Sequence, residues 1–298
     1  MRSFPEVITS VAEMKQWRRS KTGLVGFVPT MGALHAGHET LLKKIRSRCD
    51  FSILSIFVNP AQFRPHEDLS KYPRNFEKDF ETAKQAEVDL IFAPTSTELY
   101  PPNFSTFAEE TSISQPLCGQ YRPGHFRGVA TIVLKLFQLI QPQIALFGLK
   151  DAQQFFIIDR MVRDLHLDVR IEGVPTLREK DGLARSSRNI YLSPEEREKA
   201  PQLYQALLTI QKKIEEQPCL HPIDPLLEES LQLLKKYGFK IEYLECLSLP
   251  EFKSFVSPLQ NPAPGIIAAA VYLGQTRLID NIILYPQKLL DRGFHFIS

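Results

Sequence analysis

The ten residues 29–38, PTMGALHAGH, bring two glycines and two histidines together. An apolar run precedes them and a helical pattern follows, so the glycines permit a turn and the segment ends at a helix N-terminus. Free backbone N–H groups at such an end bind phosphate. His35 and His38 are three residues apart and share a helix face, where two imidazoles can stabilise charge on a triphosphate. The alternative is an ordinary strand–helix turn with two surface histidines.

Two uncharged amides follow a second apolar run, in residues 57–63. Asn59 and Gln62 are flanked by Phe57 and Phe63. This mixture suits a small substrate that carries hydroxyl and carboxylate groups on an apolar body. The alternative is an Asn-Pro turn with an incidental glutamine.

A lysine opens a predicted helix in residues 147–154, FGLKDAQQ. Lys150 can act as a point charge on phosphate. Asp151 is a candidate N-cap, and Gln154, one turn later, is expected to face the same pocket. The alternative for Lys150 is a solvated charge at the start of a helix.

Residues 178–189, REKDGLARSSRN, are predicted to form a phosphate-binding loop. Asp181-Gly182 indicates a tight turn. Ser186, Ser187 and Arg188 then offer two hydroxyls and a guanidinium that can hold the β- and γ-phosphates of a nucleotide. Such a loop can also close over the nucleotide as a lid. An exposed basic loop is the alternative.

A fifth segment, residues 121–128, reads YRPGHFRG and precedes a long apolar helical pattern. His125 and Arg127 can meet an anion there. A positively charged surface loop explains the same residues equally well, so both interpretations stay open.

The elements that must position these segments alternate between strand and helix as far as residue 175. We predict strands at 24–28, 51–58, 88–92, 144–147 and 168–172, and helices at 39–48, 75–86, 128–140 and 151–165. This alternation predicts an α/β fold with a parallel sheet. Ligands of such sheets bind at the carboxyl ends of the strands, which is where the first three segments lie.

The pattern changes after residue 176. We predict helices at 194–217 and 225–237 and strands at 240–247, 265–273 and 276–284, with Gly274-Gln275 as a hairpin turn. The sequence therefore predicts two domains: residues 1–176 bind the nucleotide and the acid substrate, and residues 177–298 form a smaller α+β domain.

Composition restricts the class of protein. The chain has 298 residues, 43% hydrophobic and 23% charged, with a net charge of +2, which is typical of a globular protein and argues against nucleic-acid binding. Its four cysteines form no CxxC pair, so we expect free thiols and no protein-built metal site. No apolar signal core or membrane-length apolar run is present. We therefore expect no membrane association and a cytoplasmic location.

Six motifs, in this order and spacing, resemble the signature of the pantothenate synthetase (pantoate–β-alanine ligase) family. They are PTMGALHAGH, SIFVNPAQF, KYPRN, RPGHFRGV, FGLKDAQQ and DGLARSSRNIYLS, and the later GQTRLIDN also fits. The resemblance covers residues from about 20 to 281. It implies a Rossmann-like nucleotidylyl-transferase domain, a smaller C-terminal lid domain and a homodimer. It also implies condensation of pantoate with β-alanine to pantothenate, AMP and pyrophosphate through a pantoyl adenylate.

The resemblance also implies site residues. His38 matches the histidine usually assigned as proton donor, and His35 and Lys150 match residues on the phosphates. Gln62 and Gln154 match the glutamines that hold pantoate, with Gln62 near β-alanine. ATP contacts are implied for Met31, Gly32, Ala33, Leu34, His35, Ala36, Gly37, His38, Gly148, Leu149, Lys150, Asp151, Leu177, Arg185, Ser186, Ser187 and Arg188. Mg²⁺ is expected to be held mainly through the nucleotide phosphates.

Two positions depart from the family pattern: Leu149 stands where many members have Glu, and Arg185 where an apolar residue is frequent. Two other functions remain open from the sequence. One is a nucleotidyltransferase that adenylylates another acid, which Gln62 and Gln154 disfavour. The other is a non-catalytic nucleotide- or RNA-binding module, which the near-neutral charge and the intact polar motifs disfavour.

Overall fold

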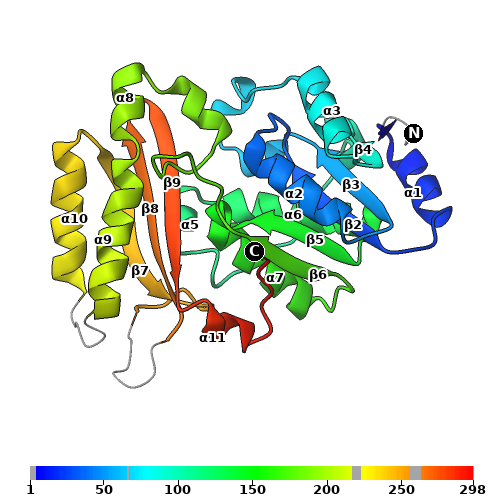
Figure 1. Ribbon diagram of the computed structural model, residues 1–298. Coiled ribbons are helices and arrows are strands. Elements are labelled where there is room, and N and C mark those ends of the chain that lie inside the picture. Colours follow the sequence, from blue (N-terminus) through cyan, green and yellow to red (C-terminus); the bar gives the residue numbers. More distant parts are fainter. Residues whose placement is uncertain (1–4, 66, 217–222, 256–262, 298) are drawn as a thin grey trace.

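Two sheets organise the chain in the computed structural model, which describes residues 5–65, 67–216, 223–255 and 263–297 (Figure 1). The larger is parallel and has six strands in the order β1-β4-β3-β2-β5-β6. The smaller is antiparallel, with the order β7-β8-β9. The predicted α/β, Rossmann-like parallel-sheet domain with a smaller α+β part is confirmed.

The parallel sheet contains the five predicted strands, each within two residues at either end, and one more. Its strands are β1 (Glu6–Ile8), β2 (Val25–Thr30), β3 (Phe51–Ile56), β4 (Leu90–Phe92), β5 (Ile144–Gly148) and β6 (Arg170–Val174). Strand β1 was not predicted, because three residues are too few to display a hydrophobic period. This strand pairs with β4 at the sheet edge.

Helices cover both faces of the parallel sheet because its strands are apolar on both sides. Phe27 packs into the core under α1 (Val11–Arg19), α6 (His125–Ile140) and α7 (Ala152–Asp164). Its neighbour Val28 packs on the opposite face, under α2 (Ala36–Arg46) and α3 (Phe76–Gln85). Short helical turns lie in the connections: η1 (Pro60–Gln62), η2 (Asp68–Ser70), α4 (Ser96–Leu99), α5 (Cys118–Tyr121), η3 (Leu149–Asp151) and η4 (Ser187–Tyr191).

The antiparallel sheet is also covered on both faces. Its strands are β7 (Lys240–Ser248), β8 (Gly265–Leu273) and β9 (Thr276–Leu284), the last two with the predicted bounds. On β8, Ile267 and Val271 pack toward α9 (Gln202–Glu216) and α10 (Asp224–Lys236). Ile266 and Ala270 belong instead to the core of the parallel-sheet domain. One face of the small sheet is thus turned toward the larger one (Figure 1).

The single helix predicted at 194–217 is wrong. The structure has α8 (Pro194–Lys199) and then α9, with Ala200 and Pro201 between them. Pro201 has no N–H to continue the helical hydrogen bonds, which explains the break. Residue 217 lies outside the described residues.

The chain returns to the parallel sheet after α11 (Gln287–Leu290). Phe296 pairs with Gly173 of β6 in parallel, and Ile297 donates its backbone N–H to the Gly173 carbonyl at 2.9 Å. Phe294 packs on Phe156 of α7. The C-terminal tail, for which the sequence suggested no role, therefore extends the sheet edge beside β6.

Cys49, Cys118 and Cys246 are free thiols, as predicted, and Cys219 lies outside the described residues. No helix in the part of the chain that the structure describes is both long and apolar enough to cross a bilayer.

Candidate active site

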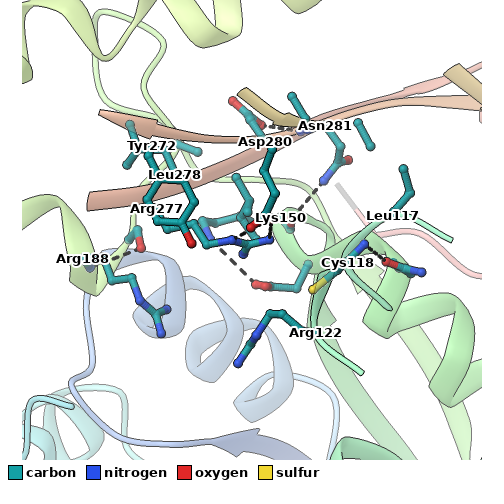
Figure 2. A pocket seen from close by; sticks show the side chains of 18 of the residues that line it. Leu117, Cys118, Arg122, Lys150, Arg188, Tyr272, Arg277, Leu278, Asp280 and Asn281 are labelled. Carbon is teal, nitrogen blue, oxygen red and sulfur yellow. Dashed lines mark hydrogen bonds and ion pairs between the residues drawn. The ribbon is translucent and has the colours of Figure 1, made fainter. Parts of the chain in front are cut away.

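A cavity of about 970 Å³ lies between the two sheets. Its walls come from the start of α7, from the loop before η4 and from β8 and β9 (Figure 2). Lys150, Asp151, Gln154, Ser186 and Arg188, all predicted site residues, line it. Segments that are distant in the sequence therefore meet around one cavity at the carboxyl ends of β5 and β6.

The two histidines of the first segment cap the helix α2. His35 is its N-cap, and its Nδ1 accepts the backbone N–H of Gly37 at 3.1 Å. Nδ1 of His38 accepts the backbone N–H of His35 at 3.3 Å, which completes a capping box. Because both Nδ1 atoms accept, the neutral rings carry their protons on Nε2. The helix end thus offers two imidazole N–H donors beside its own backbone N–H groups.

Both imidazoles are neutral near pH 7. Burial lowers the pKa of His35 to about 4, with help from the Lys150 charge. Burial also lowers the pKa of His38 to about 3, helped by His35. Lys150, Asp151 and Arg185 all act electrostatically on the His35 ring, which places this helix end beside the phosphate-binding candidates.

A carboxylate from α3 holds the turn that leads into α2. The Asp79 oxygens accept the backbone N–H groups of Ala33 at 2.9 Å and Leu34 at 2.7 Å. Gly32 has φ +79°, and a Cβ there would come within 2.7 Å of the Asp79 carboxylate, so only glycine fits this turn. Asp79 thereby fixes the backbone of the first segment.

Gln62 and Asn59 form one buried amide pair. Nδ2 of Asn59 donates to Oε1 of Gln62 at 3.0 Å and to the Gly128 carbonyl at 3.1 Å. The Tyr100 hydroxyl donates to Oδ1 of Asn59 at 2.7 Å. Asn59 is only 1% exposed, so its amide is committed to protein groups. Asn59 thereby orients Gln62, whose Nε2 reaches Met31 Sδ at 3.1 Å, and a substrate contact by Asn59 itself stays a prediction.

The fifth segment supports the same glutamine from its backbone side. Nδ1 of His125 lies 2.9 Å from the Gln62 carbonyl, and Arg122 donates to that carbonyl at 3.3 Å. Arg122 also pairs with Glu67. Arg127 stacks on the ring of Phe107, with its guanidinium 4.1 Å from the ring centroid. His125 is buried, lines the cavity and holds the Gln62 backbone.

The lysine segment lies where β5 ends. The side chains of Lys150 and Asp151 approach to 4.0 Å. Asp151 occupies the N-cap position of α7, but its side chain makes no capping hydrogen bond, so the predicted N-cap contact is absent. Leu149 is buried, and its Cδ2 lies 2.7 Å from where a Cβ on Gly173 would stand. This packing explains why an apolar side chain is tolerated where many family members have Glu.

The loop after β6 folds as a small hairpin. Arg185 donates its backbone N–H to the Leu177 carbonyl at 2.9 Å, and Arg178 and Ala184 form a bridge around the predicted turn. Arg185 pairs with Glu179 at 3.0 Å. The side chain of Leu177 is exposed.

Beyond the hairpin, the Ser186 hydroxyl accepts the backbone N–H of Arg188 at 3.3 Å and so starts η4. Ser186 and Arg188 are thereby presented to the cavity as neighbours on one short turn.

The sequence matches the family model described as Pantoate-beta-alanine ligase over residues 6–283. The chain belongs to the pantoate–β-alanine ligase family. It is 46% identical to a pantothenate synthetase of Thermotoga petrophila, over 94% of this chain and 99% of that one.

Solved structures of this family agree with the fold. Pantothenate synthetase of Thermus thermophilus superposes with a TM-score of 0.82 at 44% identity, covering 93% of this chain and 98% of that chain. The pantoate-beta-alanine ligase of Francisella tularensis, complexed with beta-gamma ATP and beta-alanine, gives a TM-score of 0.77 at 33% identity, covering 94% and 97%.

Two residues that support the first two segments, Asp79 and Tyr100, were missed by sequence reasoning from types and spacing. Asp79 and Tyr100 act through partners distant in the sequence and gave no local signal.

Proposed function

We propose that this chain condenses pantoate with β-alanine in two steps that share the cavity. The family activity is an ATP-dependent ligation that forms AMP and pyrophosphate. The observation that carries the mechanism is a cavity lined by Lys150, Ser186 and Arg188, with the histidine-capped start of α2 near enough for Lys150 and Arg185 to act electrostatically on the His35 ring. Such a set suits phosphoryl chemistry driven by positioning and charge stabilisation.

In the first step a pantoate carboxylate oxygen attacks the α-phosphorus of ATP. A bond forms between this oxygen and the α-phosphorus. The bond between the α-phosphorus and the oxygen that bridges it to the β-phosphorus breaks, and pyrophosphate leaves. His35 and His38 donate Nε2–H bonds to the phosphate oxygens as neutral imidazoles. The family role of proton donor thus becomes hydrogen-bond donation in our proposal, because both pKa values are low.

ATP is proposed to lie across the residues implied by the family resemblance. Lys150, Ser186, Ser187 and Arg188 contact the β- and γ-phosphates. The other proposed ATP contacts are Met31, Gly32, Ala33, Leu34, Ala36, Gly37, Gly148, Leu149, Asp151, Leu177 and Arg185.

Pantoate is proposed to bind between Gln62 and Gln154. Their neutral amides suit the hydroxyl groups and carboxylate of this substrate without fixing a charge. Asn59 and His125 hold Gln62 in place. In the second step the β-alanine amine attacks the acyl carbon, the acyl C–O bond breaks, and AMP leaves with that oxygen.

Mg²⁺ is proposed to accompany ATP. Among the described residues no group of three or more His, Cys, Asp or Glu can hold a metal ion, which fits an ion carried mainly by phosphates. Asp151 lines the cavity with an exposed carboxylate and is the side chain best suited to contact it. Bound Mg²⁺ would neutralise phosphate charge.

We also propose that residues 1–176 and 177–298 act as two domains, with the second closing over the nucleotide as a lid. A homodimer and a cytoplasmic location are further proposals that rest on the resemblance. Sedimentation of a monomer at working concentration would overturn the dimer.

The test of the function is pyrophosphate release from purified protein with ATP and Mg²⁺, with pantoate and β-alanine added separately and together. We expect sustained release only with both, and AMP and pantothenate in equal amounts. Sustained release with another acid but none with pantoate would overturn the assignment of substrate.

A further inference from the structure

The end of β9 touches the proposed ATP site through a residue to which no role has been given above. Nδ2 of Asn281 donates to the carbonyl oxygens of Leu149 and Lys150, both at 2.9 Å. Asn281 is 8% exposed. An amide has two N–H donors, and both are used here on the backbone that carries the Lys150 side chain. Figure 2 shows Asn281 directed at this segment.

The preceding residue holds the other phosphate-binding segment. The Asp280 carboxylate accepts hydrogen bonds from both Nη atoms of Arg178, at 2.5 and 2.9 Å. Arg178 also donates to the Gly182 carbonyl at 3.1 Å, across the hairpin turn. Its guanidinium lies 3.4 Å from the ring centroid of Tyr204. Arg178 is therefore fixed on three sides, and with it the base of the loop that leads to Ser186.

The two anchors are linked to each other. Oδ1 of Asp280 accepts the backbone N–H of Asn281 at 2.8 Å as well as the Arg178 bond. Asp280 is 3% exposed, so its charge is desolvated and compensated by a bidentate partner. One dipeptide of the antiparallel sheet thus fixes two segments that belong to the nucleotide-binding side.

We propose that Asp280 and Asn281 are positioning residues for adenylate formation, which set Lys150 and the 178–188 loop at their working separation. This inference rests on the proposed function. Displacement of a positioned group by about 1 Å can cost on the order of 10²-fold in rate. Lys150 acts on the phosphates, so its position matters in the first step. Pyrophosphate has already left before the second step.

The experiment measures the two half-reactions separately. Adenylate formation is measured as single-turnover pyrophosphate release with ATP, Mg²⁺ and pantoate. Aminolysis is measured as AMP release from supplied pantoyl adenylate with β-alanine. The variants are Asn281→Ala and the near-isosteric Asn281→Asp, which places an acceptor against two carbonyls. Lys150→Ala serves as the reference for a lost phosphate contact.

The matched control is Thr131→Val. Thr131 is a buried polar residue whose hydroxyl lies 2.7 Å from the Arg127 carbonyl and 3.3 Å from the Ala108 carbonyl. It does not line the cavity. Loss of the Thr131 hydroxyl measures the effect of removing a buried hydrogen bond that does not involve the backbone of Lys150. Thermal unfolding of each variant measures the folded fraction.

We expect both Asn281 variants to slow adenylate formation on the order of 10²-fold, with aminolysis unchanged and with Thr131→Val active in both steps. Equal loss in both steps, or loss that follows the folded fraction, would show a structural role only and overturn the inference. Adenylate formation at the wild-type rate would also overturn it. Absence of pyrophosphate release in the wild-type protein would instead refute the proposed function.

Discussion

His35 and His38 cap the same helix and lie ring against ring, with centroids 4.1 Å apart. Both use Nδ1 to accept a backbone N–H, and both are neutral at pH 7. The pair therefore presents two Nε2–H donors and no imidazolium for proton transfer. In the proposed reaction, the electrostatic work on the phosphates falls to Lys150, Arg188 and the helix end.

Replacement of His38 separates its two hydrogen bonds. His38→Ala should slow adenylate formation by roughly 10²–10³-fold, the usual cost of one charge-stabilising donor. In His38→Gln the amide N–H takes the place of Nε2–H, so this variant should retain more activity. His38→Asn keeps an acceptor near Nδ1 and should restore stability without restoring rate. Single-turnover pyrophosphate release and urea unfolding measure the two effects, and equal rates for the Gln and Asn variants would contradict the assignment.

Substitutions of Gln62 and of Tyr100 should raise the KM for pantoate by different factors. Gln62→Ala removes the proposed amide contact with pantoate and should raise the KM for pantoate about tenfold. Tyr100→Phe removes only the bond to Asn59 and should raise the KM a few-fold, roughly 1 kcal/mol. Steady-state kinetics at saturating ATP measure both. A larger effect from Tyr100→Phe than from Gln62→Ala would show that Gln62 does not touch the substrate.

Stability should fall as the pH drops from 7.5 to 5. Burial and the Arg122 charge lower the pKa of His125 to about 4, whereas the unfolded chain protonates this histidine near pH 6.5. Between these values the unfolded state binds more protons, so acid favours unfolding, by up to about 1.4 kcal/mol per pH unit for this residue. His35 and His38, with lowered pKa values, add to the same slope.

The check is urea unfolding of His125→Asn at both pH values. Asn can keep a donor to the Gln62 carbonyl but does not titrate. The pH slope of the variant should be smaller than that of the wild-type protein. The lowered pKa of Glu67, about 2, acts only below this range. An unchanged slope would mean that His125 titrates normally in the folded protein.

The C-terminal tail should contribute to the free energy of unfolding and leave the KM for ATP unchanged. Phe294 is 3% exposed and packs on Phe156 and under the Arg163 guanidinium. Phe294→Ala should therefore lower the free energy of unfolding by about 3–5 kcal/mol, as measured in urea. The KM for ATP of the folded variant should stay at the wild-type value. A large rise in that KM would give the tail a role in the site.

The sequence predicted what short-range pattern determines. Strands β2 to β6 of the parallel sheet, the helix that begins after His35 and the turn at Gly182 each depend on neighbours within a few residues. Because β3, β2 and β5 are adjacent and parallel, the segments that follow them meet at one edge of the sheet. That made Lys150 a predictable site candidate.

The remainder depends on long-range contacts. The contacts that hold Asn59 could not be predicted, because its partners Tyr100 and Gly128 lie 41 and 69 residues away in the sequence. Asn281 acts on Lys150 across 131 residues. Contacts between residues so far apart in the sequence cannot be predicted from the spacing of residues within a motif. Pro201 is a local signal for a helix break. The prediction gave more weight to the amphipathic pattern and therefore placed one helix there.

The central claim is that pantoate is activated as an acyl adenylate, and isotope transfer tests it most directly. Pantoate labelled with ¹⁸O in both carboxylate oxygens is turned over with ATP, Mg²⁺ and β-alanine, and AMP is analysed by mass spectrometry. Attack on the α-phosphorus followed by acyl C–O cleavage leaves one ¹⁸O in each AMP and one in pantothenate. Unlabelled AMP, with the label in pyrophosphate or inorganic phosphate, would contradict the adenylate route.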